Sequence, residues 1–205
     1  MKPIKGKNRA ALLALALAAV SSFSRAEMIP KGWVKAGTVP QMYDVSLLRS
    51  TDGRSAVTLS SIGEKAVVLP DPMPHDVFGT LMQTISSAAY AGKRLRLTAT
   101  VSADMVRGWA GLWMRVDGAQ GKALAFDNMM KHPIKGSAEA KKYSVVLDVP
   151  ANAQSVSYGI LLDGPGAVTL SGVSVETVGK DVPITSGPIP EPMLTKPQNL
   201  DFSEN

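Results

Sequence analysis

Hydrophobic and polar residues alternate with a period of two over several short stretches of the chain. From Arg94 to Val101, leucine, alanine and valine at the odd positions alternate with arginine and threonine at the even ones. The same alternation occurs over Tyr143–Val149 and over Val156–Leu162. Because successive side chains of a strand point to opposite faces, each stretch predicts a half-buried β-strand.

Two further stretches depart from simple alternation. Gly108–Asp117 has alanine, leucine, methionine and valine on one side and two tryptophans on the other. Both sides could be covered, so we expect a central strand. Farther on, Val168 and Leu170 share one parity and Val173 and Val175 share the other. Ser171-Gly172 lies at this change and predicts a β-bulge.

Weaker patterns predict five more strands. They lie at Met42–Leu48, Ser55–Ser61, Lys65–Leu69, Phe78–Ile85 and Lys122–Asp127. Proline and glycine separate the strands at short intervals. About ten short strands with turns every eight to twelve residues indicate an all-β protein, an antiparallel β-sandwich or jelly roll.

The first 26 residues have the pattern of a secretory signal peptide. Four basic residues precede the apolar run Ala10–Val20, and Ser24-Arg25-Ala26 supplies small residues before a cleavage site. The run is shorter than the roughly 20 residues that span a bilayer, so we expect no membrane-spanning segment. From residue 181 the chain becomes proline-rich. We therefore divide it into a signal peptide (1–26), a β-sandwich domain (27–180) and a proline-rich C-terminal arm (181–205).

Removal of the signal peptide changes the charge of the protein. The full chain has 22 basic and 17 acidic residues and a net charge of +5. Five of the basic residues and none of the acidic ones lie in the signal peptide, which leaves 17 of each. A nucleic-acid-binding protein needs a basic surface, so we expect no nucleic-acid partner. Export places the protein in the periplasm or outside the cell.

The composition also restricts metal and cofactor chemistry. Cysteine is absent, which excludes disulfides, cysteine-based zinc sites and iron–sulfur clusters. His75 and His132, the two histidines, are far apart in the sequence. We therefore predict neither a metal site nor a cofactor.

Four stretches of the chain resemble a known family. They are Phe78–Gln83, Tyr90–Leu97, Gly108–Asp117 and Ala125–Met129. Together they resemble a bacterial family of secreted β-sandwich modules, which are similar to carbohydrate-binding-type, galactose-binding-like jelly rolls. Some members carry a transcription-regulator label, but this chain shows no helix-turn-helix pattern. The resemblance covers residues 32–179 and implies a jelly roll without specifying an activity.

The chain departs from this resemblance in its last strand. Such jelly rolls often have an aromatic residue followed by paired aspartates there. This chain has Thr169, Ser171 and Gly172 at the corresponding positions. The departure weakens a calcium site, which needs clustered carboxylates.

Trp109 and Trp113 are the first candidates for a binding site. Positions i and i+4 of a strand share one face about 13 Å apart. Gly111 between them would leave a gap, and Arg115 follows on the same face. Two flat rings beside a gap predict a platform for stacking sugars. The alternative is that both rings pack under a loop or the second sheet.

Other polar residues could contribute to the same site. Asp127 and Asn128, with His132 nearby, could hold ligand hydroxyls, or could cap a turn of their own backbone. Gln83 could face the same groove, or could satisfy a backbone edge. Arg94 and Arg96 could bind an acidic ligand, or could pair with acids such as Asp148 and Glu176.

The leading hypothesis is an exported, non-catalytic binding module for a carbohydrate or a similar polyhydroxylated molecule. Its predicted ligand-binding residues are Trp109, Trp113, Arg115, Asp127, Asn128 and Gln83. A protein–protein interaction or envelope-assembly module, with residues 183–205 as its contact, is the alternative. A hydrolase is the third hypothesis. The chain after the signal peptide has no Gly-x-Ser-x-Gly nucleophile elbow, and we assign no catalytic residue.

Overall fold

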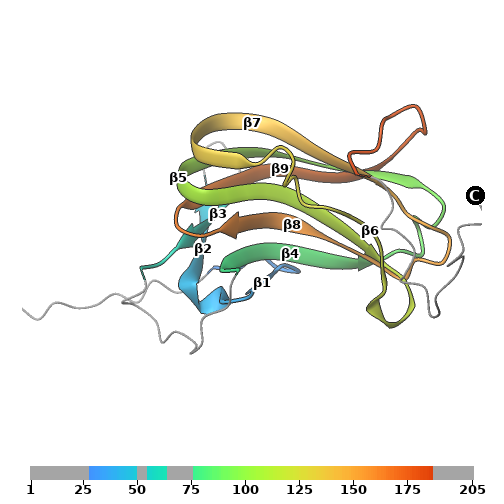
Figure 1. Ribbon diagram of the computed structural model, residues 1–205, viewed down its shortest axis with the longest axis horizontal. Helices are drawn as coiled ribbons and strands as arrows, with labels where there is room; N and C mark the ends of the chain where they lie inside the picture. Colours follow the sequence, from blue (N-terminus) through green and yellow to red (C-terminus); the bar gives the residue numbers. More distant parts are fainter. Residues whose placement is uncertain (1–27, 50–54, 64–75, 187–205) are drawn as a thin grey trace, which may run out of the picture.

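The computed structural model describes residues 28–49, 55–63 and 76–186 (Figure 1). Within these ranges, the chain forms nine strands and two short 3-10 helices, η1 (Pro40–Met42) and η3 (Ala119–Gly121). The strands are β1 (Val34–Gly37), β2 (Tyr43–Arg49), β3 (Ser55–Ser61), β4 (Phe78–Ser86), β5 (Arg94–Asp117), β6 (Ala123–Asp127), β7 (Ile134–Asp148), β8 (Ser155–Asp163) and β9 (Ala167–Val178). The predicted all-β class is confirmed. The signal peptide, the strand expected at Lys65–Leu69 and most of the C-terminal arm lie outside the described residues.

Strand β5 connects the two layers of an antiparallel sandwich. Its first half, residues 94–104, pairs with β9 and also with β7, whereas residues 109–117 pair with β8. The end of β5 pairs with β6. One layer therefore has the order β1-β4-β8-β5-β6, and the other has the order β2-β3-β9-β5-β7. We name them the β4–β8 layer and the β3–β9 layer (Figure 1).

The prediction of two separate strands at 94–101 and 108–117 was wrong. They form one strand, because the chain between them stays paired with β7 through three shifts of register. Met105 lies there with a φ of 48°, a left-handed conformation that is uncommon outside glycine. These irregularities bend the strand as it passes from one layer to the other.

The predicted bulge in the last strand is confirmed. Thr98 of β5 pairs with Ser174, and Thr100 pairs with Ser171, so β9 has one extra residue between the two pairs. Gly172 lies in this bulge with a φ of 58°, which glycine adopts at little cost. The bulge explains why the inward-facing parity changes along β9.

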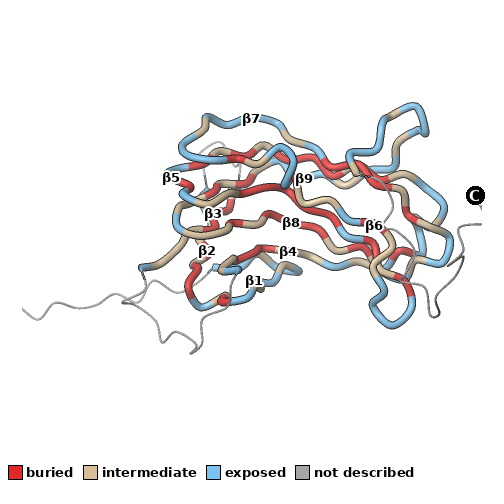
Figure 2. Tube along the Cα trace, in the orientation of Figure 1, coloured by how far each residue is buried: buried red, intermediate tan, exposed pale blue. Residues whose placement is uncertain are grey.

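The core lies between the two layers, at the positions that the alternation predicted. Leu95, Leu97, Ala99 and Val101 of β5 are all essentially buried. Residues 110–114 are buried on both faces of the strand, which confirms that this stretch is central. Figure 2 shows the buried positions running along β5, β8 and β9.

Arg94 and Arg96 form cross-strand ion pairs, as one of the two alternatives predicted. The Arg94 guanidinium donates to both carboxylate oxygens of Asp148 at 2.9 and 3.0 Å. Arg96 donates to Glu176 at 2.9 Å, and Lys180 donates to Asp148 at 2.8 Å. These bonds link β5 to β7 and to β9, and they link β7 to the residues after β9.

We expect the pairing of Asp148 to make the free energy of unfolding depend on pH in the acidic range. The hydrogen bonds from Arg94, and secondarily from Lys180, lower the pKa of Asp148 from 3.8 to about 2. Because the folded-state pKa is lowered, the stabilisation is present above pH 3.8 and is lost as the pH falls towards 2. The carboxylate is 42% exposed, so solvent screening limits the effect to about 1 kcal/mol.

Urea unfolding of the wild type and of Asp148→Asn at neutral and acidic pH measures this effect. The wild type should lose about 1 kcal/mol more than the variant on acidification. Equal losses in the two proteins would contradict the assignment.

The described residues contain neither a membrane-spanning helix nor a cluster of metal ligands. No helix among them is both long and apolar enough to cross a membrane. They also contain no group of three or more histidine, cysteine, aspartate or glutamate side chains that could hold a metal ion.

Candidate ligand-binding cleft

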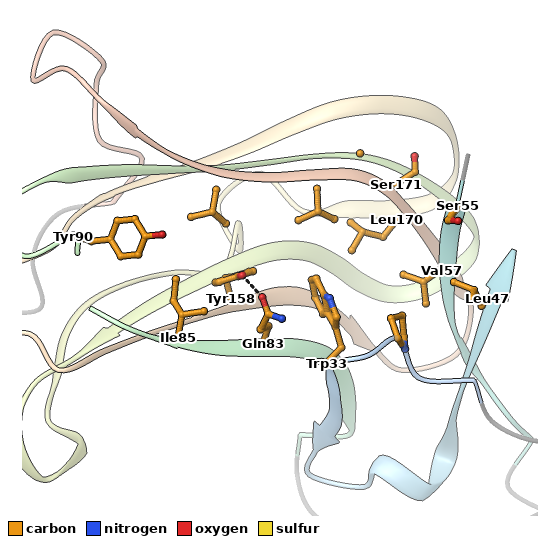
Figure 3. A pocket seen from close by; sticks show the side chains of 15 residues that line it. Trp33, Leu47, Ser55, Val57, Gln83, Ile85, Tyr90, Tyr158, Leu170 and Ser171 are labelled. Atoms are coloured by element: carbon orange, nitrogen blue, oxygen red, sulfur yellow. Dashed lines mark hydrogen bonds between the residues drawn. The ribbon is translucent and has the colours of Figure 1, made fainter. Parts of the chain in front are cut away.

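A cleft of about 530 Å³ opens between the inner faces of the two layers. From the β4–β8 side it is lined by Trp33, Gln83, Ile85, Tyr90 and Tyr158, and from the β3–β9 side by Leu47, Val57, Leu170, Val173 and Val175. Figure 3 shows Trp33, Gln83 and Tyr158 on one side of this space and Leu170 on the other. Several of them are only partly buried, including Trp33, Ile85 and Tyr90, because the layers are not in full contact there.

Three aromatic rings line the cleft along its β4–β8 side. Trp33 precedes β1, and its backbone N–H donates to Pro30 at 3.0 Å, which forms a turn. Its ring meets Tyr158 edge to face, with the ring centroids 6.0 Å apart. Tyr90 is held in the turn after β4 by a hydrogen bond from its N–H to Ser87. Partly exposed flat rings offer contact area to a ligand at little cost in side-chain entropy.

Gln83 supplies a fixed polar group between these rings. It lies directly opposite Tyr158 in the β4–β8 register. The Tyr158 hydroxyl donates to Gln83 Oε1, and Gln83 Nε2 donates to the Gly32 carbonyl at 3.0 Å. Burial raises the pKa of Tyr158, so the hydroxyl stays protonated and keeps this bond at neutral pH. The amide has two N–H donors, and one of them is used by Gly32.

The six residues predicted from the sequence do not form one site. Gln83 lines the cleft, whereas Trp113 and Arg115 line a separate groove of about 380 Å³. Asp127 and Asn128 line a third hollow, of about 800 Å³. Trp109 is partly buried and lines none of the three.

Gln83 satisfies a backbone carbonyl, that of Gly32, as the second of its two interpretations predicted. It does not share a groove with Trp113, for a reason of register. Gln83 pairs with Tyr158, and Tyr158 pairs with Met114. Gln83 therefore shares the inner face with Met114, whereas Trp113, the next residue along β5, faces outward.

The open gap expected beside Trp113 is filled. A β-carbon at Gly111 would lie 2.7 Å from the Asn128 carbonyl oxygen and 2.9 Å from Met129 Cβ. The turn after β6 therefore occupies this space. Trp113 is 8% exposed, and its Nε1 donates to Thr80 Oγ1 at 2.8 Å. The ring edge forms part of the outer groove with Arg115 and Phe126.

Asp127 and Asn128 cap the turn, as the second of their two interpretations predicted. Asp127 Oδ1 accepts the N–H of Met129 at 2.8 Å, and Asn128 Oδ1 accepts the N–H of Met130 at 3.1 Å. Two successive side-chain caps of this kind fix a tight connection between strands. The polar atoms of both residues are thus used in part by their own backbone.

The aromatic residues of the cleft were not among the predicted site residues. Trp33 precedes β1, a short strand that no alternation marks. Tyr158 lies in the alternating stretch Val156–Leu162, but the alternation does not give its neighbours across the layers. The usable signal was Gln83, because an amide at an inward position of an apolar strand must find partners.

Comparison with known proteins gives one relative in sequence. No protein-family model matches the chain. It is 38% identical over 176 residues to the uncharacterized HTH-type transcriptional regulator YbfP of Bacillus subtilis (strain 168). The match covers 85% of this chain and 57% of that protein, so the chain spans little more than half the length of its relative.

Comparison with solved structures returns similar folds. The enzymatically active domain of tailspike protein 4 from bacteriophage CBA120 matches with a TM-score of 0.53 and 16% identity, over 72% of this chain and 20% of that one. The C-terminal family 22 carbohydrate-binding module of Clostridium thermocellum Xyn10B matches with a TM-score of 0.49 and 9% identity. This match covers 73% of this chain and 88% of that one. At these identities the likeness is one of fold alone. Carbohydrate-binding modules among similar folds, and a transcription-regulator label on a relative, are both features that the sequence resemblance predicted.

Proposed function

We propose that the chain is an exported, non-catalytic binding module, and that the cleft between its layers binds a neutral carbohydrate. The observation that carries this proposal is the cleft itself, where the partly exposed rings of Trp33 and Tyr90 and the buried ring of Tyr158 flank a fixed amide. Export rests on the signal-peptide pattern of the first 26 residues.

The lining suits the two kinds of surface that a sugar ring presents. The axial C–H groups of a pyranose form an apolar face, which packs on Trp33 or Tyr90. The hydroxyl groups at the ring edge need hydrogen-bond partners, which Gln83 and Tyr158 can supply. Every residue that lines the cleft in the described ranges is uncharged. A neutral polysaccharide therefore enters without leaving a buried charge unpaired.

A titration of the purified protein against a panel of neutral polysaccharides tests the proposal. Binding measured by calorimetry should be at least about tenfold weaker for Trp33→Ala, which corresponds to about 1.4 kcal/mol. Tryptophan fluorescence of the wild type should shift on saturation, because Trp33 is in the cleft.

Trp109→Phe is the matched control, because Trp109 lines neither the cleft nor the two outer grooves. It should bind as the wild type does, and circular dichroism should show that both variants are folded. A panel without any binding polysaccharide, or equal affinities for wild type and Trp33→Ala, would refute the proposed site.

A further inference from the structure

A groove distinct from the cleft lies beside the turn after β6. It has a volume of about 800 Å³ and shares no lining residue with the cleft. Residues 126–132, residues 141–144 of β7 and residues 184–186 form its walls. We call it the basic groove, because its lining includes Lys131, Lys141 and Lys142.

The three lysines are exposed and are not neutralised by the described part of the protein. None of them lies within ion-pair distance of a carboxylate there. Asp127 is the one acidic residue in the described lining, and one of its oxygens already accepts the N–H of Met129. Arg94, Arg96 and Arg115, by contrast, each pair with a carboxylate. The basic groove therefore keeps an uncompensated positive charge, although the chain as a whole has equal numbers of basic and acidic residues after residue 26.

Apolar and aromatic side chains lie beside these charges. Phe126 is 36% exposed and Ile184 is 37% exposed, and Tyr143 is partly buried. Lys141 Nζ lies 5.9 Å from the centre of the Tyr143 ring. The groove thus combines an ammonium group, which lies over the Tyr143 ring, with the exposed side chains of Phe126 and Ile184. A ligand that fits must combine an apolar face with a negative charge.

The walls of the groove are held by hydrogen bonds. Thr185 donates its N–H to the Val146 carbonyl at 2.9 Å, and the Val146 N–H donates to Thr185 Oγ1 at 2.9 Å. This pairing fixes the residues after β9 on the outer edge of β7. On the other side, the two side-chain caps hold residues 127–130 in their turn. A groove with both walls fixed loses little entropy when a ligand binds.

We propose that the basic groove binds an acidic polysaccharide. The carboxylates of successive uronate residues lie against Lys131, Lys141 and Lys142, of which the last two point to opposite faces of β7, and a sugar ring packs on Phe126. An isolated phosphate or carboxylate would use the lysines but not the rings. A nucleic acid needs a wider basic surface than three lysines in a chain that has equal numbers of basic and acidic residues after residue 26. This site is independent of the neutral cleft, and either could exist without the other.

Polygalacturonate and its fully methyl-esterified form are the matched probes. They share one backbone, and only the first carries negative charges. Affinity electrophoresis or calorimetry should show binding of the acid form and at least about tenfold weaker binding of the ester. Raising the salt concentration from about 0.02 M to about 0.3 M should strongly weaken binding of the acid form, because the lysines are exposed to solvent and their charges are screened.

Lys142→Glu and Lys93→Glu form a matched pair of charge reversals. Lys142 lines the basic groove, whereas Lys93 is also exposed, lies outside the groove and donates from Nζ to the Ala89 carbonyl at 2.8 Å. Lys142→Glu should lose at least about tenfold in affinity for polygalacturonate, and Lys93→Glu should keep wild-type affinity. Trp33→Ala should also bind it normally, which separates this site from the cleft.

Three results would overturn the inference. Equal affinities for the acid and the ester would remove the role of charge. Equal losses in Lys142→Glu and Lys93→Glu, both shown to be folded by circular dichroism, would mean that the charge effect is not local. Tighter binding of a duplex DNA oligonucleotide than of polygalacturonate would identify a phosphate-binding surface instead.

Discussion

Replacing Trp113 by alanine should lower the free energy of unfolding by about 3–5 kcal/mol, the usual cost of removing a large buried aromatic side chain. Trp113 lies in the central strand β5 and is 8% exposed. Its Nε1 donates to Thr80 Oγ1, which in turn donates to the Ile160 carbonyl at 2.8 Å. The substitution therefore leaves a cavity and removes the donor to a buried hydroxyl. Urea unfolding at neutral pH measures the loss.

Trp113→Phe and Trp109→Ala separate the causes. Phenylalanine keeps most of the volume but not the N–H, so the loss should fall to about 1–2 kcal/mol. Trp109 is less buried than Trp113, so its replacement by alanine should cost less than that of Trp113. If Trp113→Ala were as stable as the wild type and had lost polysaccharide binding, the open platform expected from the sequence would be correct.

The fold could be predicted in large part because alternation is a local property. In β5, β8 and β9, apolar residues at every second position face inward, and these are the residues that are buried. Two features needed long-range information. β5 is continuous because β7 stays paired with it across the irregular stretch around Met105. β1 has four residues and is set by its register with β4, from Val34 opposite Met82 to Gly37 opposite Gly79.

The candidate site could be predicted only in fragments. Parity gives the face of a side chain within its own strand, but not which strand lies beside it or in what register. Gln83 and Trp113 therefore seemed compatible with one groove, although they lie on opposite faces of one layer. The gap expected at Gly111 took account of that strand alone, and the structure fills it. The turn that fills it comes from residues after β6, and its approach depends on the tertiary fold.

A methyl group at Gly159 should disturb both the fold and the cleft. A β-carbon there would lie 2.2 Å from the Leu81 carbonyl oxygen and 2.9 Å from Met82 Cα. Both atoms belong to the backbone of β4, so β4 and β8 must separate. Gly→Ala in a strand can gain about 0.4–1 kcal/mol from the unfolded state. Overpacking of this kind costs about 1–3 kcal/mol, so we expect net destabilisation.

The position of Gly159 connects this strain to binding. It follows Tyr158, and its partner Met82 precedes Gln83, so a separation of the strands there displaces the pair that fixes the amide in the cleft. Gly159→Ala should therefore lower the melting temperature and weaken binding of any neutral polysaccharide that Trp33→Ala also weakens. Gly63→Ala is the matched control, because a β-carbon at Gly63 meets no atom within 4 Å. A Gly159→Ala protein with wild-type stability would show that β4 and β8 are less closely packed than this geometry requires. A destabilised variant with unchanged affinity would show instead that the Gln83–Tyr158 pair does not determine binding.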